Sequence, residues 1–318
     1  MRIPRRSTWL AALISVVSVA AVVHWATGQE APHLPQSDAG WLWLALALAV
    51  TGVALVCRAW RWHWIMRAAR IEHRRNDAVG LTVVGYMGNN VLPARGGELL
   101  KVGLLGTRTP ARHREVLGTV VTERVLDAAV LLALFAVLTW VGVDGLASMR
   151  GTAVIAAGGL VAACLASVAY LTLRRRGLFN RFAETVRPVA GASRQLVTRR
   201  GIPLAVWSVA IWALDGATVL LAARSVGAHL SEASALAVVV LGSLAAAIPA
   251  APGYVGTFDA AFLVGLHAAN IRGGDAVSVL LMSRFVLFGP PTVAGLAILL
   301  FAYGDLRARG RALRRAPT

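Results

Sequence analysis

Apolar residues occupy most of this 318-residue chain, in runs whose lengths match the thickness of a membrane. A helix needs about 20 apolar residues to cross roughly 30 Å of hydrocarbon. Six runs meet or approach this length, and we expect full spans at about 9–25, 41–57, 116–141, 151–173, 202–223 and 276–302. The largest non-apolar segment, Arg174 to Arg200, is too short for a catalytic domain. The pattern predicts an all-α polytopic membrane protein, with residues 1–318 in a single integral membrane domain.

Residues 78–106 break this pattern. The apolar run at 78–92 would cover roughly 22 Å as a helix, which is short of a full crossing. The motif LPARGG and a second apolar stretch near 97–106 follow it. Basic residues flank the segment at Arg74-Arg75 and from Arg95 onward, so both ends belong on the cytoplasmic side. We predict a re-entrant hairpin lining a polar cavity, because backbone at membrane depth must be satisfied by protein or enclosed water.

Residues 235–270 are also apolar but are broken at Pro249 and at Pro252-Gly253. Two interpretations fit this pattern. Two full spans with a tight inner turn would give eight spans in all. A second hairpin, entering from outside, would give six spans plus two re-entrant hairpins. Both arrangements keep the C-terminus inside, so counting crossings does not choose between them.

The two broken segments share a short motif. LPARGG at 92–97 and IPAAPG at 248–253 both follow an apolar-Pro-Ala-x-x-Gly pattern, offset by 156 residues. With two hairpins, the halves 1–145 and 146–318 each contain span, span, hairpin and span, and they start on opposite sides. This is the order of an inverted-topology repeat, which builds transporters with a site at the repeat interface. Chance similarity of six small residues in an Ala-rich chain is the alternative.

The placement of charge is more informative than the net charge of +17. Among 32 basic residues, 27 fall in five segments, which are 1–8, 58–77, 95–115, 174–200 and 304–318. Loop 26–40 contains no Lys or Arg. This positive-inside pattern predicts a cell-membrane protein with cytoplasmic N- and C-termini, and it argues against nucleic acid as a partner. The first apolar run lacks a convincing cleavage site, so we expect a retained span rather than a signal peptide.

The segment RAWRWHWIMRAAR, residues 58–70, alternates Arg and Trp directly after the second span. This composition is typical of an amphipathic segment in the inner headgroup layer. Cys57 and Cys164 lie in apolar runs without metal spacing, and the histidines of the apolar runs are isolated. No nucleophile–base motif, P-loop or dinucleotide fingerprint occurs. The sequence therefore indicates no catalytic residues, no metal site and no cofactor, and it does not favour an enzyme.

Candidate chemistry centres on the first broken segment. A proline ends one half-helix, and a glycine pair allows a tight turn into the next. The free N–H groups of that second half-helix, beside an arginine, suit a phosphate or another anion. The candidate headgroup-binding residues here are Asn89, Asn90, Pro93, Arg95, Gly96, Gly97 and Glu98. The alternative is a structural turn in which Glu98 caps the helix and pairs with Arg95.

Span 116–141 carries three charged residues, Glu123, Arg124 and Asp127. At helical spacing Glu123 and Asp127 share one face, and Arg124 lies three residues before Asp127. A bare charge at mid-membrane costs from about 2.5 kcal/mol to 10 or more, so these groups must face the bundle interior and pair. At this depth they would meet the Arg95 segment. A buried salt-bridge cluster that fixes helix packing is the alternative, and both roles are compatible.

The second broken segment mirrors the first. Its candidate residues are Pro252, Gly253, Gly256, Thr257 and Asp259. Free N–H groups and Thr257 would bind a headgroup from the other side. Asp259 would be a proton or cation carrier, or only an N-terminal helix charge favoured by the dipole. Asp215 and Arg284 are lone intramembrane charges that are candidates to pair with each other.

With these residues in view, the chain resembles the lysylphosphatidylglycerol synthase transmembrane-region family, also called flippase-like domain proteins. The resemblance rests on RAWRWHWIM, GNNVLPARGGELLKVGLL, ERVLD at 123–127 and IPAAPGYVGTFDAA, and it covers nearly the whole chain. In the multiple peptide resistance factor, such a region is joined to a soluble domain that transfers lysine from lysyl-tRNA to phosphatidylglycerol. The membrane region then moves the product between leaflets. One departure is Phe258-Asp259, where the resemblance leads us to expect an Arg-Glu-like pair.

The resemblance implies a stand-alone membrane part without lysyl transfer. Related members are linked to polyprenyl- or dolichol-phosphate glycan pathways. Our first hypothesis is a lipid translocase for an anionic or aminoacylated phospholipid or a polyprenyl-phosphate-linked lipid. The alternative is a membrane-embedded transferase, or a subunit of one, acting on a lipid-linked sugar or phospholipid, with Glu98, Glu123 or Asp127 as base. A third is a structural partner for a separately encoded synthase or glycosyltransferase.

Overall fold

The structure of the chain, a computed structural model, describes residues 24, 27–28, 31–92, 95–143, 201–247 and 252–313. Helices and the turns between them make up the described residues, with no strand among them. The all-α prediction is therefore confirmed for this part of the chain. Apart from His24, the predicted spans 9–25 and 151–173 lie outside it.

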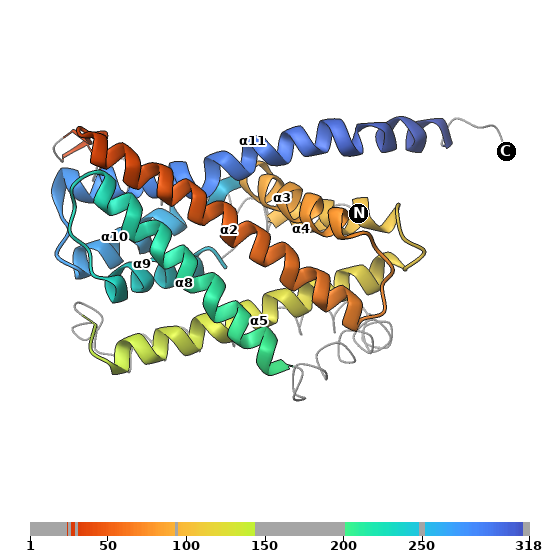
Figure 1. Cartoon of the computed structure of the whole chain (residues 1–318), viewed down its shortest axis with the longest axis horizontal. Helices are drawn as coiled ribbons and strands as arrows, with labels where there is room; N and C mark the ends of the chain where they lie inside the picture. The colour runs from red at the N-terminus through yellow and green to blue at the C-terminus, as the bar shows by residue number, and fades with distance from the viewer. Residues whose placement is uncertain are drawn as a thin grey trace.

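The described helices follow one another along the chain and pack into an elongated bundle (Figure 1). They are α2 (Asp38–Ala68), α3 (Arg75–Val91), α4 (Gly96–Gly106), α5 (His113–Trp140), α8 (Gly201–Ser225), α9 (Glu232–Ala245), the 3₁₀ turn η2 (Pro252–Tyr254), α10 (Thr257–Ala268) and α11 (Gly273–Leu313). By length and composition, α2, α8 and residues Gly273–Tyr303 of α11 could each cross a membrane. Helix α5 has 28 residues, which is a spanning length, but it carries the charged residues at 123, 124 and 127.

Helix α2 continues without a break through the arginine- and tryptophan-rich segment. Its 31 residues run past Cys57 to Ala68, and Arg58 and Arg61 are buried. An amphipathic segment in the headgroup layer would expose its arginines, so the prediction for residues 58–70 is wrong for Arg58 and Arg61, although Trp60 and Trp64 are exposed. The physical reason is that buried carboxylates on neighbouring helices pair with these arginines, which removes the cost of burying them.

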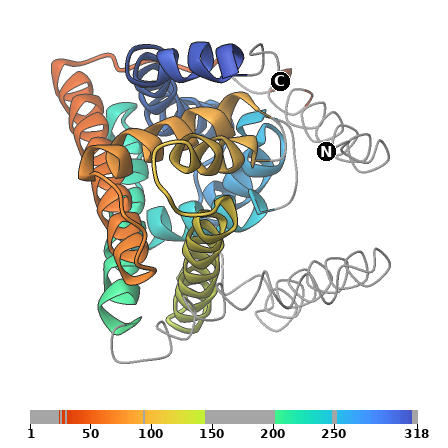
Figure 2. The same ribbon diagram turned by 90° about the vertical axis from the view of Figure 1, so that its right-hand side faces the viewer.

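Helices α2 and α8 lie antiparallel along one side of the bundle (Figure 2). The indole of Trp207 donates to the Cys57 carbonyl at 2.9 Å, near one end of the pair. Further along, the hydroxyls of Thr51 and Thr218 lie 3.4 Å apart. Near the other end, a Cβ on Gly40 would lie 2.7 Å from the Ser225 carbonyl oxygen. The contact therefore runs along most of both helices.

Helices α3 and α4 form a tight helical hairpin, here called the first hairpin. An ideal Cβ built on Gly88 would lie only 2.5 Å from the Gly97 Cα, and the aliphatic stem of Lys101 packs beside Gly85. The two backbones therefore touch, which only glycine permits. With 17 and 11 residues, the helices are about 25 and 17 Å long, less than the roughly 30 Å of hydrocarbon.

Helices α9 and α10, joined through η2, form a second hairpin. A Cβ on Gly265 would lie 3.1 Å from the Val238 Cα, so these helices are also closely packed. They contain 14 and 12 residues, about 21 and 18 Å. Gly253 and Gly256 have positive φ angles of 65° and 91°, which glycine adopts readily and which turn the chain into α10.

The hairpins enter the bundle from opposite ends, and their tips meet (Figure 1). At the base of the first hairpin, Thr109 donates to the Glu72 carbonyl at 2.8 Å. At the opposite end, where the second hairpin begins, His33 contacts the Val226 carbonyl at 3.1 Å. Between the two ends, the Arg95 guanidinium of the first hairpin donates to the Ala246 carbonyl of the second at 3.0 Å.

The two described halves use the same helix order and the same contacts. Each places a long helix, a hairpin and a second long helix in sequence, and α5 and α11 flank the paired hairpins on opposite sides (Figure 2). Glu98 is the third residue of α4 and pairs with Arg124, the twelfth residue of α5. Asp259 is the third residue of α10 and pairs with Arg284, the twelfth residue of α11. These matched ion pairs agree with a repeat.

Candidate functional site

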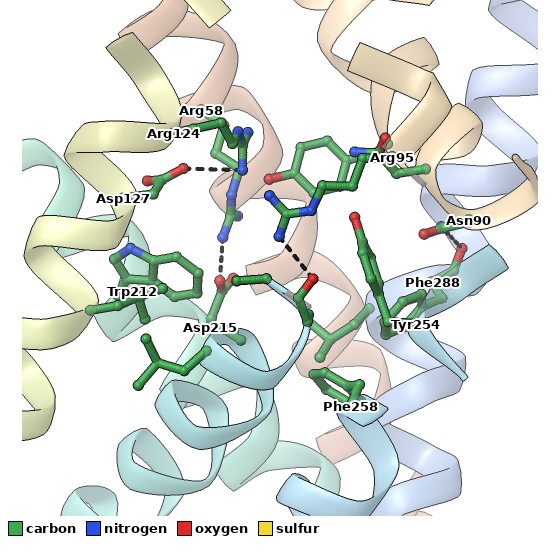
Figure 3. A pocket seen from close by; sticks show the side chains of 18 of the residues that line it. Arg58, Asn90, Arg95, Arg124, Asp127, Trp212, Asp215, Tyr254, Phe258 and Phe288 are labelled. Carbon is green, nitrogen blue, oxygen red and sulfur yellow. Dashed lines mark hydrogen bonds and ion pairs between the residues drawn. The ribbon is translucent and has the colours of Figure 1, made fainter. Parts of the chain in front are cut away.

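A cavity of about 200 Å³ lies where the two hairpin tips meet α2, α5, α8 and α11 (Figure 3). Its wall combines polar groups with a larger apolar part. The polar lining consists of Thr51, Arg58, Tyr86, Asn89, Asn90, Arg95, Arg124, Asp127, Trp212, Asp215, Ser243 and Tyr254. Ligand pockets for whole drug-sized molecules start at about 300 Å³. This volume suits a headgroup rather than a complete lipid.

Arg95 occupies the turn between α3 and α4 and reaches into this cavity (Figure 3). Its backbone is left-handed, with φ 56° and ψ 38°, a conformation that non-glycine residues adopt rarely and that concentrates at functional sites. Beyond its bond to Ala246, the guanidinium lies over the Tyr254 ring at 5.6 Å. The nearest carboxylate oxygen is that of Glu98, at 3.9 Å, which is a weak contact.

Four buried polar atoms of cavity-lining residues have no hydrogen-bond partner among the described residues. They are Nε of Arg95, Oδ1 of Asn89, Nε1 of Trp212 and Nε of Arg124, the last of which lies in an ion pair with Glu98. Buried polar atoms in folded proteins are nearly always paired, so each exception calls for an explanation. Three of these atoms are N–H donors and one is an acceptor.

Glu98 lies between two of the cavity arginines, Arg95 and Arg124. The Nε atom of Arg124 is 3.1 Å from Glu98 Oε1, and another nitrogen of Arg124 is 3.3 Å from Asp127 Oδ2. Arg124 thus links α4 to its own helix α5. Glu98 pairs more closely with Arg124 than with Arg95, which leaves Arg95 as the less neutralised of the two.

Behind this wall lies a deeper charge network that solvent does not reach. Glu123 accepts from Lys101 at 3.1 Å and from Arg61 at 3.3 Å. Arg61 also donates to Asp127 at 2.6 Å, and Lys101 lies over the Trp62 ring at 3.6 Å. Charges buried at this depth are stable only when they are paired and hydrogen-bonded. This network therefore fixes α2, α4 and α5 relative to one another.

A further ion pair crosses between the halves on the cavity floor. Arg58 of α2 donates to Asp215 of α8, and both side chains line the cavity (Figure 3). The Arg58 guanidinium also lies 5.6 Å from the Tyr86 ring and 5.7 Å from the Trp212 ring. The prediction that Asp215 pairs with Arg284 is wrong. Arg284 instead pairs with Asp259 and donates to the Gly253 carbonyl at 3.3 Å.

The apolar part of the wall comes from both halves. It contains Leu55, Ala128, Leu131, Leu244, Ala246, Ala247, Phe258, Leu287 and Phe288. The rings of Phe258 and Phe288 pack edge to face at 5.5 Å. Asn90 donates to the Phe288 carbonyl at 3.2 Å and to Thr292 at 2.8 Å, so it joins the first hairpin to α11.

The structure brings only some of the predicted site residues to the cavity. Asn89, Asn90, Arg95, Arg124 and Asp127 line it directly. Glu98 contacts the cavity-lining Arg124, whereas Glu123 lies behind the wall and pairs with Arg61 and Lys101. Pro93 lies outside the described residues.

The glycines and the second turn have structural contacts instead. Gly97 makes the close backbone contact between α3 and α4 rather than only a turn, and a Cβ on Gly96 would meet Leu92 at 2.8 Å. The Gly256 N–H donates to Asp259 at 2.9 Å, which caps α10. The cavity lining contains none of the predicted residues of the second turn, which are Pro252, Gly253, Gly256, Thr257 and Asp259. From this segment, Tyr254 and Phe258 line the cavity.

Sequence reasoning missed several cavity residues. Arg58 was assigned to the headgroup layer, and Lys101, which lies in the network behind the cavity wall, was not singled out. Tyr86 and Trp212 carried no signal beyond their occurrence in apolar runs. For Arg58 and Arg61 a signal did exist, because they lie three residues apart on one helical face that extends the preceding span.

The model of the family described as lysylphosphatidylglycerol synthase TM region matches residues 9–295. The chain belongs to this family. A UPF0104 membrane protein of Methanothermobacter thermautotrophicus is 25% identical over 271 residues, covering 74% of this chain and 78% of the relative. A protein named glycosyltransferase AglD, from Haloferax volcanii, is 24% identical over 296 residues, covering 78% of this chain. Only 47% of that second protein is spanned.

Membership accounts for the extent of the earlier resemblance and identifies the chain as a membrane protein. The motifs that carry the resemblance, including LPARGGE and ERVLD, supply Arg95, Glu98, Arg124 and Asp127 of the site. In this member of the lysylphosphatidylglycerol synthase TM region family, two of the resembling motifs therefore contribute residues to the cavity or its border.

Proposed function

We propose that this protein is a lipid translocase that moves a phosphate-containing lipid between membrane leaflets. The observation that carries the proposal is Arg95. This arginine lies at the meeting point of two hairpin tips, lines the cavity, and has no close carboxylate of its own. A partly exposed arginine whose planar fork has no close carboxylate is suited to a phosphate oxygen.

The proposed topology places the cavity near the middle of the membrane. Both hairpins are too short to cross, and they come from opposite ends, so we interpret them as re-entrant hairpins within an inverted repeat. The positive-inside pattern then puts both termini in the cytoplasm. A headgroup held between the tips would lie about equally far from either surface, while its acyl or polyprenyl chains remain in lipid.

The proposed ligand is an anionic phospholipid or a polyprenyl-phosphate lipid. Arg95 and the unpaired Trp212 N–H would donate to the phosphate, and the Asn89 carbonyl oxygen would accept from a headgroup hydroxyl. Leu131, Leu244 and the other apolar wall residues would contact the first carbons of the chains. The sequence contains no P-loop, so we propose passive or gradient-coupled movement.

An exchange assay in vesicles tests this function. Purified protein is reconstituted with acyl-labelled fluorescent phosphatidylglycerol, and a membrane-impermeant reductant quenches the outer leaflet. Wild type should make the inner-leaflet lipid accessible, and Arg95→Ala should not. Arg95→Lys, which keeps the charge but loses the planar fork, should retain a part of the rate.

Arg114→Ala is the matched control, because Arg114 is exposed near the start of α5, away from the cavity. It should exchange lipid at the wild-type rate. Size-exclusion profiles and thermal unfolding establish that each variant is folded. Folded wild type that exchanges neither this lipid nor a polyprenyl phosphate would refute the proposal.

A second candidate function rests on one comparison. The relative from Haloferax volcanii is named a glycosyltransferase, and this chain spans about half of its length. On this basis we also propose, as the alternative, a membrane part that works with a glycosyltransferase or synthase on a lipid-linked sugar. Product formation from a polyprenyl-phosphate sugar by purified protein, abolished in Glu98→Gln, would favour this alternative over translocation.

A further inference from the structure

The buried ion pairs can be used to ask how much charge the headgroup carries. Among the described residues, the cavity, the network behind it and the adjoining second turn contain six basic side chains, Arg58, Arg61, Arg95, Lys101, Arg124 and Arg284. The same region contains five carboxylates, Glu98, Glu123, Asp127, Asp215 and Asp259. With each group in its ordinary ionised state, the region has one more positive charge than negative charges.

The surplus charge can be assigned to Arg95. Asp215 pairs with Arg58, and Asp259 pairs with Arg284, so these two carboxylates are used within their own pairs. Arg95 approaches only Glu98, at 3.9 Å, on the oxygen that Arg124 already occupies at 3.1 Å. Its closest hydrogen-bond acceptor is a neutral carbonyl.

The remaining carboxylates also have basic partners. Glu123 is shared by Arg61 and Lys101, and Asp127 is shared by Arg61 and Arg124. Among the described residues, both carboxylates that line the cavity, Asp127 and Asp215, are therefore already paired with a guanidinium. A cationic headgroup would enter next to an already uncompensated guanidinium.

Resting on the proposed translocase function, we infer that the headgroup carries a single negative charge, as a phosphodiester does. One phosphodiester neutralises the surplus cation, which is the favourable outcome in a low-dielectric site. A phosphomonoester carries about −1.5 to −2 at neutral pH and would leave excess negative charge. An aminoacylated phospholipid adds positive charge without a partner. This substrate class differs from the lysylated lipid that appears in the description of the family.

The test compares four acyl-labelled lipids in one vesicle composition at pH 8. They are phosphatidylglycerol with charge −1, phosphatidic acid near −2, zwitterionic phosphatidylcholine, and lysylphosphatidylglycerol as the cationic lipid. Phosphatidylglycerol should exchange about tenfold faster or more than each of the others, given the cost of an uncompensated charge at membrane depth. Equal or faster exchange of phosphatidic acid or of the lysylated lipid would overturn the inference.

Charge variants test the inference through the ratio of two exchange rates, which does not depend on the amount of folded protein. Glu98→Gln removes one carboxylate and raises the surplus to two, so the ratio of phosphatidic acid to phosphatidylglycerol exchange should rise several-fold. Glu115→Gln is the matched control, because Glu115 is exposed at the start of α5 and caps that helix. Its ratio should equal that of wild type. An unchanged ratio in folded Glu98→Gln would contradict the charge balance.

The source of the diester is resolved in the same assay. A fluorescent polyprenyl phosphosugar has the same single charge as phosphatidylglycerol, so faster exchange of either supports the charge inference and identifies the lipid class. Failure of every lipid to exchange refutes the translocase itself. Exchange without preference for the monoanion refutes only the charge inference. The two failures are therefore distinguishable.

Discussion

Replacement of Gly88 by alanine tests whether the backbone contact in the first hairpin positions Arg95. A Cβ at this position would lie 2.5 Å from the Gly97 Cα and 3.3 Å from the Gly97 nitrogen. Carbon atoms pack at about 3.5 Å or more, so α3 and α4 must separate by about 1 Å. The obstructing atoms belong to backbone, and no side-chain rotation can relieve the clash.

The expected cost follows from two opposing terms. Overpacking of this size costs about 1–3 kcal/mol. Alanine in a helix gains up to about 1 kcal/mol over glycine. With the full alanine gain, the net loss of stability should therefore be about 0–2 kcal/mol, well below the level that unfolds most proteins. Because Arg95 directly precedes α4, a shift of that helix moves the guanidinium away from Ala246. The rate of lipid exchange should then fall by at least the factor that corresponds to the lost free energy of unfolding.

Gly103→Ala is the matched control on the same hairpin. No atom lies within 4 Å of its ideal Cβ, so the variant should be as stable as wild type or slightly more so. Thermal unfolding in detergent, followed by tryptophan fluorescence, measures stability, and the vesicle assay measures exchange. If Gly88→Ala matched Gly103→Ala in both measurements, the close packing of the hairpin would not be what positions Arg95.

Three further predictions concern the cavity wall and floor. Asp215→Asn leaves Arg58 buried without its counter-ion and should cost about 3–5 kcal/mol, whereas the double variant Arg58→Met with Asp215→Leu should recover most of that loss in a thermal melt. Recovery of less than half would show that the pair does more than neutralise itself. Trp212→Phe removes an N–H that has no partner among the described residues, together with part of a buried ring. Stability should therefore fall only by the lost packing, while exchange should slow a few-fold, in keeping with a lost hydrogen bond to the ligand of about 1 kcal/mol. Loss of stability without loss of exchange would remove Trp212 from the site. Ser243→Phe should fill part of the 200 Å³ cavity and block exchange in folded protein, and unimpeded exchange would place the lipid path elsewhere.

The broken apolar segments could be recognised from sequence because proline and glycine interrupt them at fixed offsets. The charged residues 123, 124 and 127 were correctly expected to pair inside the bundle, since the cost of a bare charge leaves no other stable arrangement. Their partners were not predictable in the same way. Arg61, which pairs with two of these residues, was assigned with its neighbours to the headgroup layer, because alternating Arg and Trp is also the pattern of an interface.

Partner choice at a distance depends on helix rotation, which a single sequence does not encode. Asp215 and Arg284 were the two remaining lone charges, and pairing them was the simplest arrangement. In the structure, Asp215 pairs with Arg58, which was assigned to the headgroup layer, and Arg284 pairs with Asp259, which was assigned to the second turn. Likewise, Gly97 was assigned to a turn because turns are the commonest use of a glycine pair, whereas its close approach to α3 is visible only in three dimensions.

The contacts across the two halves have a consequence for biogenesis. Arg58 relies on Asp215, Asn90 on Phe288 and Thr292, and Arg95 on Ala246. Early in translation, the first half would enter the bilayer with an arginine whose counter-ion has not yet been synthesised. That half would remain a target for membrane quality control until the second half arrived. Split into two polypeptides between residues 145 and 146, the halves would each be short-lived alone and would persist only when made together.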